Sequence, residues 1–266
     1  MTAHDSKTFA AMTAVTDLIR YEIKNHVAKI TFNRPDKKNA INIEMRDALA
    51  NAMEDTRTND DVWIVVIAAE GDTFSAGKDL AEKLPPGARD LPIDELYALQ
   101  RRIYKPIIAA LNGPCLAQGS SFALNADIIV MSESAAIGWP HVRIGLTSVS
   151  GPSCGAHAMP WRVAMGYMLR GKLISPEECL RWGIVNEVVA PEELMPTVDR
   201  WVAEIMEGAP LAFWAMKEAA RRGQELPFEI RMCIARDVSN VIFKTEDALE
   251  GISAFREKRK PVWKGR

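Results

Sequence analysis

Two short glycine-containing turns constrain the fold of this chain more than any other feature. Residues 71–80 read GDTFSAGKDL, and residues 112–130 read NGPCLAQGSSFALNADIIV. Each turn joins an apolar, strand-like run to a helix-like run, so each leaves backbone N–H groups without a partner. Two such turns facing one pocket would make an oxyanion hole, a pair of donors aimed at a carbonyl oxygen that gains negative charge.

Composition excludes several classes of function. The 266 residues are 48% hydrophobic, enough for one large core, and the net charge of −2 gives no reason to expect nucleic-acid or anionic-membrane binding. The four cysteines are scattered, so we expect no metal site, no disulfides and a reducing compartment. No apolar run reaches the roughly 18–20 residues of a membrane span, and residues 1–20 lack a signal sequence. We therefore expect a cytoplasmic protein.

Strand-like and helix-like runs alternate through the first half of the chain. Residues 21–35 predict two strands around Asn25 and His26, and residues 45–53 carry apolar side chains at helical spacing. Nearly continuous apolar runs, typical of strands covered on both faces, occur at 62–69, 106–113, 127–132 and 135–139. This alternation indicates an α/β fold with parallel strands.

The last third of the chain is expected to be helical. An apolar stripe predicts one helix through Ile230, Ile234, Val238, Val241 and Ile242. Thr245 is the predicted N-cap of a final helix with an acidic start and a basic end. Residues 81–105 contain Pro85, Pro86, Gly87 and a charged helix-like segment, and we expect a mobile loop over a pocket there.

Five segments in order resemble the crotonase family, also called the enoyl-CoA hydratase/isomerase family. They are the two glycine turns, NRPDKKNAIN (33–42), GKLISPEECLRWGIVNEVV (171–189) and KTEDALEGISAFREKRKPVW (244–263). The resemblance implies an α/β spiral of ββα units with a C-terminal helical trimerisation region. It divides the chain into an arm (1–20), a spiral core with the acyl-CoA site (21–195) and a helical region (196–266).

The family resemblance also implies the ligands and partners. Members act on coenzyme A thioesters as substrates, in fatty acid metabolism among other roles, with no permanently bound cofactor and no metal. They assemble as homotrimers or as dimers of trimers. We expect the same here, with no nucleic-acid or membrane partner.

Two backbone N–H groups would form the oxyanion hole. The resemblance assigns the first to Lys78, between Gly77 and Asp79, in a segment that begins with Ala76 and lies beside the substrate. A gapless count from the second glycine turn puts the second donor at Gln118. Gly119 is the alternative, because the family usually has glycine at both positions and glutamine would be strained if the site needs a positive φ.

The acid–base positions depart from the family pattern. Hydratases of the family carry two glutamates, and the same count puts Ser121 and His141 at those positions. Serine has no useful basicity at neutral pH, whereas histidine is a competent acid and base. We predict that His141 is the base and that Ser121 orients water or substrate. The alternatives are a hydrogen-bonded packing role for His141 and an ordinary helical position for Ser121.

Several further residues are candidates for substrate contacts. Phosphates of CoA would meet Lys37 or Lys38, and Lys258 from a neighbouring subunit, although exposed lysines often serve only solubility. Possible pocket residues are Trp139, Phe122 and His157, although apolar residues there are more often core. A Cys154 nucleophile is a weaker reading, because cysteine is often a small buried hydrophobe.

Three functions remain open from the sequence. The first is a hydratase-like or isomerase-like enzyme that passes through an oxyanion-stabilised enolate with a histidine as its acid and base. The second is hydrolytic C–C cleavage of a β-diketone or a β-oxoacyl-CoA. The third is a non-catalytic paralogue that binds acyl-CoA. The sequence does not reveal the acyl group.

Overall fold

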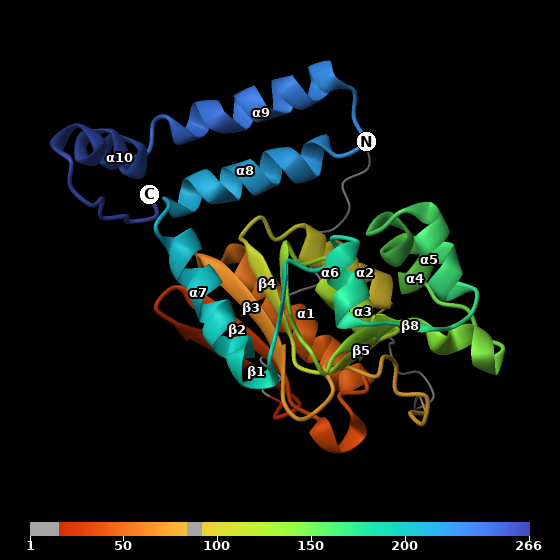
Figure 1. Ribbon diagram of the computed structural model, residues 1–266. Helices are drawn as coiled ribbons and strands as arrows, with labels where there is room; N and C mark the ends of the chain where they lie inside the picture. Colours follow the sequence, from red (N-terminus) through yellow and green to blue (C-terminus); the bar gives the residue numbers. More distant parts are fainter. Residues whose placement is uncertain (1–15, 84–91) are drawn as a thin grey trace.

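A six-stranded sheet forms the centre of the computed structural model, which describes residues 16–83 and 92–266 (Figure 1). Its strand order is β1 (Ile19–Lys24), β2 (Val27–Phe32), β3 (Ile64–Ala69), β4 (Ile107–Leu111), β6 (Ile128–Ser132) and β9 (Glu187–Val189). β1 pairs antiparallel with β2, and every later pairing in this sheet is parallel. The predicted α/β fold with parallel strands is confirmed.

Both faces of the large sheet are buried, which explains the continuous apolar runs. In β3, Val65 and Ile67 belong to one core cluster, while Ile64, Val66 and Ala68 belong to the other. Successive side chains of a strand point to opposite faces, so a strand covered on both sides must be apolar at every position. Helices α1 (Ile43–Thr58), α2 (Ile93–Arg101) and α3 (Gln118–Leu124) contribute to the first cluster, and α7 (Leu194–Met206) contributes to the second.

A smaller three-stranded sheet carries the second glycine turn. Its order is β5 (Pro114–Leu116), β7 (Ala136–Gly138) and β8 (Leu173–Ile174). β5 and β7 are parallel, with Leu116 opposite Gly138. Ser75 forms an isolated parallel bridge with Cys115. The small sheet therefore brings the first glycine turn, the start of α3 and the end of β7 together.

The remaining helices lie outside the two sheets. They are α4 (Ser150–Ser153), α5 (Trp161–Met168), α6 (Pro176–Arg181), α8 (Pro210–Gly223), α9 (Phe228–Ile242) and α10 (Glu246–Glu257), with one-turn 3-10 helices η1 (Pro35–Lys37), η2 (Pro140–Ile144), η3 (Gly155–His157) and η4 (Pro191–Glu193). α8 and α9 run side by side, with α9 farther from the sheet, and α10 follows α9 (Figure 1). Within the parts of the chain that the structure describes, no helix is both long and apolar enough to cross a membrane.

The C-terminal helices match the local sequence signals but leave an apolar surface. The Thr245 hydroxyl accepts a hydrogen bond from Ala248 N at 3.1 Å, so the predicted N-cap is confirmed. α9 has no buried residue, although its apolar stripe lies within the helix as predicted. The stripe therefore does not pack into the core of this chain.

Two boundaries differ from the sequence analysis. The charged segment predicted within 81–105 is the helix α2, and its Leu96 and Tyr97 are buried in the core, so this part is not a surface loop. Residues 84–91 and 1–15 lie outside the described residues, so the loop and most of the arm stay predictions. α7 begins at Leu194, and its Val198 is buried against the sheet, so the boundary predicted at 195/196 falls inside a sheet-packing helix.

Candidate active site

The first glycine turn is held by backbone hydrogen bonds on both sides of Lys78. Ala76 N donates to Lys38 O at 2.9 Å, and Asp79 N donates to Ile41 O at 3.0 Å. Between them, the N–H of Lys78 has no acceptor within residues 16–83 and 92–266. The Lys78 side chain is exposed, so only its backbone is fixed. The N–H group that the sequence analysis selected thus has no acceptor in the described ranges, and its role stays a prediction.

Gly77 brings the two glycine turns into direct contact. Its φ is +97°, and a Cβ added there would lie 2.5 Å from the Cβ of Ala117 and 3.3 Å from the backbone nitrogen of Gln118. Both the dihedral angle and the close approach require glycine. The backbone nitrogen of Gln118 therefore lies beside the residue that precedes Lys78.

In the second turn, the strained backbone conformation is at Ala117, which the sequence analysis did not consider. Ala117 has φ 53° and ψ −122°, an uncommon conformation for a residue with a Cβ. Gln118 follows as the first residue of α3, so glutamine itself is not strained. In the part of the chain that the structure describes, no backbone acceptor bonds the N–H groups of Gln118 and Gly119.

Gly119 has a packing function. A Cβ there would lie 2.5 Å from the Cβ of Ser75 and 3.1 Å from its carbonyl oxygen. Glycine at this position therefore lets α3 approach the first turn. Since Gln118 N is the nitrogen that lies next to Gly77, the geometry favours Gln118 over Gly119 as the second donor.

Ser150 connects the second turn to the segment that carries His141. Its hydroxyl donates to Ala117 O at 2.8 Å and accepts from Trp139 Nε1 at 3.1 Å. Ala117 N in turn donates to Gly138 O at 3.0 Å. These bonds fix the end of β7 against the start of α3. Sequence reasoning missed Ser150 because Ala117 and Trp139, which it links, are distant from it in the chain.

His141 lies in η2, immediately after β7, with its side chain partly exposed. Its Nδ1 atom is buried and has no hydrogen-bond partner among the described residues. Burial lowers the pKa of His141 below the ordinary value of 6.5. The lowered pKa favours the neutral imidazole, and no described residue engages its Nδ1. This arrangement contrasts with the hydrogen-bonded packing role that was its alternative.

Ser121 is buried one helical turn into α3. Its hydroxyl lies 3.5 Å from the Cys154 sulfur, to which it donates. Tyr97 reaches the same region from α2 and donates its hydroxyl to Gln118 O at 3.0 Å. Burial raises the pKa of Tyr97 well above its ordinary value, so the hydroxyl remains a donor. Sequence reasoning missed Tyr97, although its helical spacing with Leu96 and Gln100 on the buried face of α2 is a usable signal.

Three predicted pocket residues lie in different environments. Phe122 is completely buried and packs edge-to-face on Phe32 and Tyr97, with ring centroids 5.7 and 5.3 Å apart. Trp139 is also buried, against the glycines of the 150–155 segment. His157 is exposed on η3. The structure thus makes Phe122 and Trp139 core residues and does not bring His157 into the buried cluster.

The predicted CoA contacts are exposed lysines. Lys37 and Lys38 lie on and directly after η1, and Lys258 caps α10 in a left-handed conformation. Asp79 is engaged, because the Arg34 guanidinium at 2.7 Å bonds its carboxylate and lowers the pKa of that carboxyl. In the described ranges, no three His, Cys, Asp or Glu side chains gather closely enough to hold a metal ion.

The chain matches the enoyl-CoA hydratase/isomerase family over residues 22–266. It is 33% identical over 253 residues to (E)-benzylidenesuccinyl-CoA hydratase of Thauera aromatica, covering 93% of this chain and 99% of the relative. It is 37% identical over 255 residues to carnitinyl-CoA dehydratase of Salmonella typhi, covering 90% and 95%.

Solved structures agree with the sequence comparison. The crystal structure of an enoyl-CoA hydratase/isomerase from Mycobacterium paratuberculosis matches with a TM-score of 0.86 at 30% identity, covering 94% of this chain and 99% of that one. A probable enoyl-CoA hydratase/isomerase from Mycobacterium abscessus matches with a TM-score of 0.86 at 32% identity, covering 95% and 100%.

Proposed function

The chain belongs to the enoyl-CoA hydratase/isomerase family, and from that premise we propose that it hydrates an enoyl-CoA thioester or dehydrates the corresponding hydroxyacyl-CoA. In this proposal the N–H groups of Lys78 and Gln118 hold the thioester oxygen, and His141 moves the proton. The family acts on CoA thioesters. Two relatives of this chain are named as a hydratase and a dehydratase, which supports the addition or removal of water as its reaction.

The single observation that carries the proposal is the contact between the two glycine turns. A Cβ at Gly77 would lie 3.3 Å from the backbone nitrogen of Gln118, so the N–H groups of Lys78 and Gln118, which have no backbone acceptor among the described residues, lie in adjacent segments. Two donors fixed by a folded backbone need no reorganisation when an oxyanion develops between them, and losing one such donor typically costs about 3–4 kcal/mol in the barrier. An enolate of a thioester is the species that this pair would stabilise.

His141 supplies the acid–base chemistry in this proposal. Its neutral imidazole takes a proton from water as the oxygen bonds to the β-carbon, and the electron pair of the double bond moves to the thioester oxygen as the enolate forms. The imidazolium then returns the proton to the α-carbon. One group thus shuttles one proton, and the net reaction adds one water across the double bond. The unpartnered Nδ1 and the lowered pKa of His141 both support this role.

Ser121 has an orienting function in this scheme. It is buried beside Cys154, and its hydroxyl can accept from water or substrate while it donates to the Cys154 sulfur. Tyr97 holds the carbonyl of Gln118 and so fixes the orientation of the first turn of α3. We propose Tyr97 as a positioning residue, since it acts through Gln118.

We also propose that the chain forms a homotrimer or a dimer of trimers, in which Lys258 of a neighbouring subunit joins Lys37 or Lys38 at the CoA phosphates. The large exposed apolar side chains of the C-terminal helices support an interface: Phe228, Ile230, Met232, Val241, Leu249, Ile252 and Phe255. Exposed apolar surface on this scale marks an interaction site. Light scattering of the purified protein tests the mass directly; a monomer contradicts the assembly.

Proton exchange tests the reaction. The protein is incubated in D2O with enoyl-CoA and saturated acyl-CoA thioesters of varied acyl groups, and the products are analysed by mass spectrometry. We expect a gain of one D2O in an enoyl-CoA and deuterium at the α-carbon, both lost in His141→Ala. Deuterium entry that persists in His141→Ala contradicts the role of His141.

Other products would identify the alternatives. An enoyl-CoA that gains deuterium without gaining oxygen indicates double-bond isomerisation. A β-oxoacyl-CoA or a cyclic β-diketone that yields a carboxylate indicates hydrolytic C–C cleavage. A thioester that binds in a calorimeter without exchanging any proton indicates a non-catalytic acyl-CoA-binding protein. Each of these outcomes overturns the hydratase proposal.

A further inference from the structure

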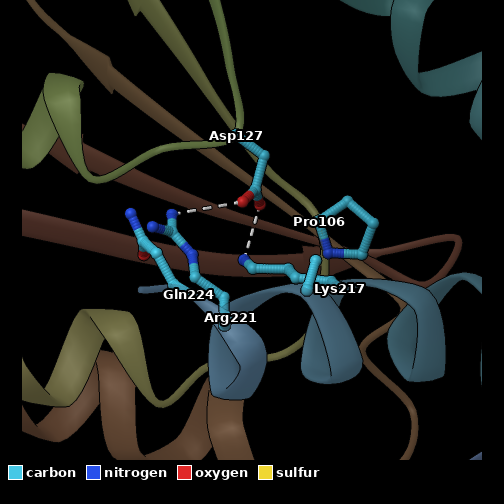
Figure 2. A pocket seen from close by; sticks show the side chains of 6 residues that line it. Pro106, Asp127, Lys217, Arg221 and Gln224 are labelled. Atoms are coloured by element: carbon cyan, nitrogen blue, oxygen red, sulfur yellow. Dashed lines mark hydrogen bonds and ion pairs between the residues drawn. The ribbon is translucent and has the colours of Figure 1, made fainter. Parts of the chain in front are cut away.

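A cavity lies at the amino ends of β4 and β6, where α8 meets the sheet. It has a volume of about 400 Å³ and is lined by Pro106, Asp127, Lys217, Ala220, Arg221 and Gln224. Figure 2 shows Lys217 and Arg221 reaching from α8 toward Asp127, with Pro106 beside them. The glycine turns follow the carboxyl ends of β3 and β4, so this cavity is separate from the candidate active site.

Lys217 is the central group of the cavity. Its Nζ lies 2.5 Å from Asp127 Oδ2 and donates to Lys105 O at 2.7 Å. Asp127 also accepts from Ile107 N at 2.8 Å and lies 3.4 Å from the Arg221 guanidinium. The Lys217 side chain is only 10% exposed, yet it lines an open cavity. A buried amine is thus held beside a carboxylate and can still be reached by a ligand.

Lys105 provides an internal comparison. Its Nζ donates to Asn59 O and lies 5.0 Å from the centre of the Trp214 ring, so it is covered. Burial lowers the pKa of both Lys105 and Lys217 to about 8. Lys217 lines the cavity, whereas Lys105 does not. The amines of Lys105 and Lys217 therefore have similarly lowered pKa values, but only Lys217 lines the cavity.

We propose that Lys217 is a site of acylation by coenzyme A thioesters, the class of compound on which this family acts. The cavity can hold a short acyl group along the apolar stems of Lys217 and Arg221, while the CoA moiety stays in solvent. Asp127 and the carbonyl oxygen of Lys105 hold the Lys217 nitrogen in place. The structure thus offers a buried nitrogen and a space for the acyl group at one place.

The reaction balances without any further reactant. The ammonium of Lys217 first releases a proton to water, and the amine attacks the thioester carbonyl carbon. A C–N bond forms and the C–S bond breaks, so the products are an amide on Nζ and CoA, whose thiolate takes up a proton. The amide no longer carries a charge. The ion pair between Lys217 and Asp127 is then lost, which weakens the attachment of α8 to the sheet.

Quantitative peptide mass spectrometry after incubation of the full chain with acetyl-CoA tests this proposal. Acetyl-CoA has no double bond to hydrate, so the result does not depend on the proposed function. Exposed Lys244 and covered Lys105 serve as the internal references. At pH 7.5 we expect acetylation of Lys217 to exceed that of Lys244 about tenfold, because burial favours the uncharged amine. It should exceed that of Lys105 as well, because Lys105 is covered.

The pH dependence gives a second readout. Acetylation of Lys217 should level off by pH 9, because its pKa is about 8 in the presence of Asp127 and Arg221. An ordinary solvated lysine, with a pKa of about 10.4, continues to react faster over the same range. Equal rates at the three lysines, or a Lys217 rate that keeps rising through pH 9, would overturn the proposal.

Two variants separate the cavity from the active site. In Lys217→Arg, the acetyl label should disappear from this peptide while labelling of Lys244 continues. In His141→Ala, acetylation of Lys217 should be unchanged. Dependence of the Lys217 label on His141 would contradict the proposal, because the acyl transfer would then need the active site.

Discussion

Polar groups at the two ends of the parallel sheet differ in whether they have hydrogen-bond partners in the protein. At the carboxyl ends, the N–H groups of Lys78 and Gln118 and the Nδ1 of His141 have no protein partner within the described residues. At the amino ends, Lys217 and Asp127 satisfy each other and link α8 to the sheet. Burying the Nδ1 of His141 without a partner costs about 1–3 kcal/mol, which a hydrogen bond from a ligand or water would offset.

Because of this difference, substitutions at the two ends of the sheet should have separate effects, on turnover at one end and on stability at the other. Changes at the carboxyl ends should reduce turnover with small effects on stability, because the groups there bond nothing in the protein. Changes at the amino ends should reduce stability with small effects on turnover. The following predictions test this separation, in order of expected size.

His141→Ala should have the largest effect. We expect kcat/KM for hydration to fall by about 10²–10⁴-fold, because a positioned acid–base group typically contributes that much. Steady-state kinetics measure it. His26→Ala is the matched control, since His26 stacks on Trp63 in the β1–β2 turn at the other end of the sheet. Comparable losses of kcat/KM in His141→Ala and His26→Ala would contradict the expected difference between the carboxyl and amino ends of the sheet.

Gly77→Ala should be next, with kcat lower by about 10²–10³-fold, the usual effect of losing one oxyanion donor. The added Cβ would meet Ala117 and push the two turns apart. Gly183→Ala is the control, because Gly183 also has a positive φ of 69° but has open space around it. It should show only the backbone penalty, roughly 1 kcal/mol of stability. Full activity of Gly77→Ala would refute the assigned oxyanion hole.

Lys217→Met should lower the free energy of unfolding by about 2 kcal/mol, because it removes hydrogen bonds that involve charged groups. The activity per folded molecule should remain within about twofold of the parent, since the cavity is remote from the glycine turns. Urea unfolding and kinetics together measure the split, with Lys244→Met at an exposed lysine as control. If Lys217→Met keeps its stability but loses activity, the expectation that changes at the amino ends affect stability rather than turnover is wrong.

Tyr97→Phe should lower kcat by about fivefold, which corresponds to one hydrogen bond of about 1 kcal/mol. The lost hydroxyl leaves Gln118 O without its donor and loosens the first turn of α3. KM should change less than kcat, since Tyr97 acts through Gln118. Tyr167→Phe is the control, because that hydroxyl bonds Glu178 at 3.5 Å on α6. A purely structural Tyr97 would lower the melting temperature and leave kcat unchanged.

The pH profile of kcat/KM should show the smallest effect. The base must be neutral, and burial lowers the pKa of His141, so activity should fall only as the pH drops through a value below 6.5. An acidic midpoint at or above 6.5 would exclude this histidine as the titrating base. The acidic limb should also be missing from the residual activity of His141→Ala.

Local sequence signals determined the elements. Residues 64–69 are all apolar because successive side chains pack into the cores on opposite faces of the sheet. Thr245 marks the start of α10 because its hydroxyl accepts a hydrogen bond from Ala248 N, three residues later. The family motifs also led to Lys78, whose N–H has no acceptor among the described residues and whose role as an oxyanion donor stays a prediction. The burial pattern and the cap depend on neighbours in the chain, so the sequence alone was sufficient for them.

Only the tertiary structure decided how distant residues meet. It moved the expected strain from Gln118 to Ala117, because the contact with Gly77 fixes that turn. It brought the Tyr97 hydroxyl to Gln118 O, and it joined Lys217 to Asp127, which is remote from it in the sequence. Burial and hydrogen bonding between remote segments set these contacts and the acidity of Lys217. Neither quantity can be obtained from residue type or spacing, because both depend on which atoms exclude water from the group.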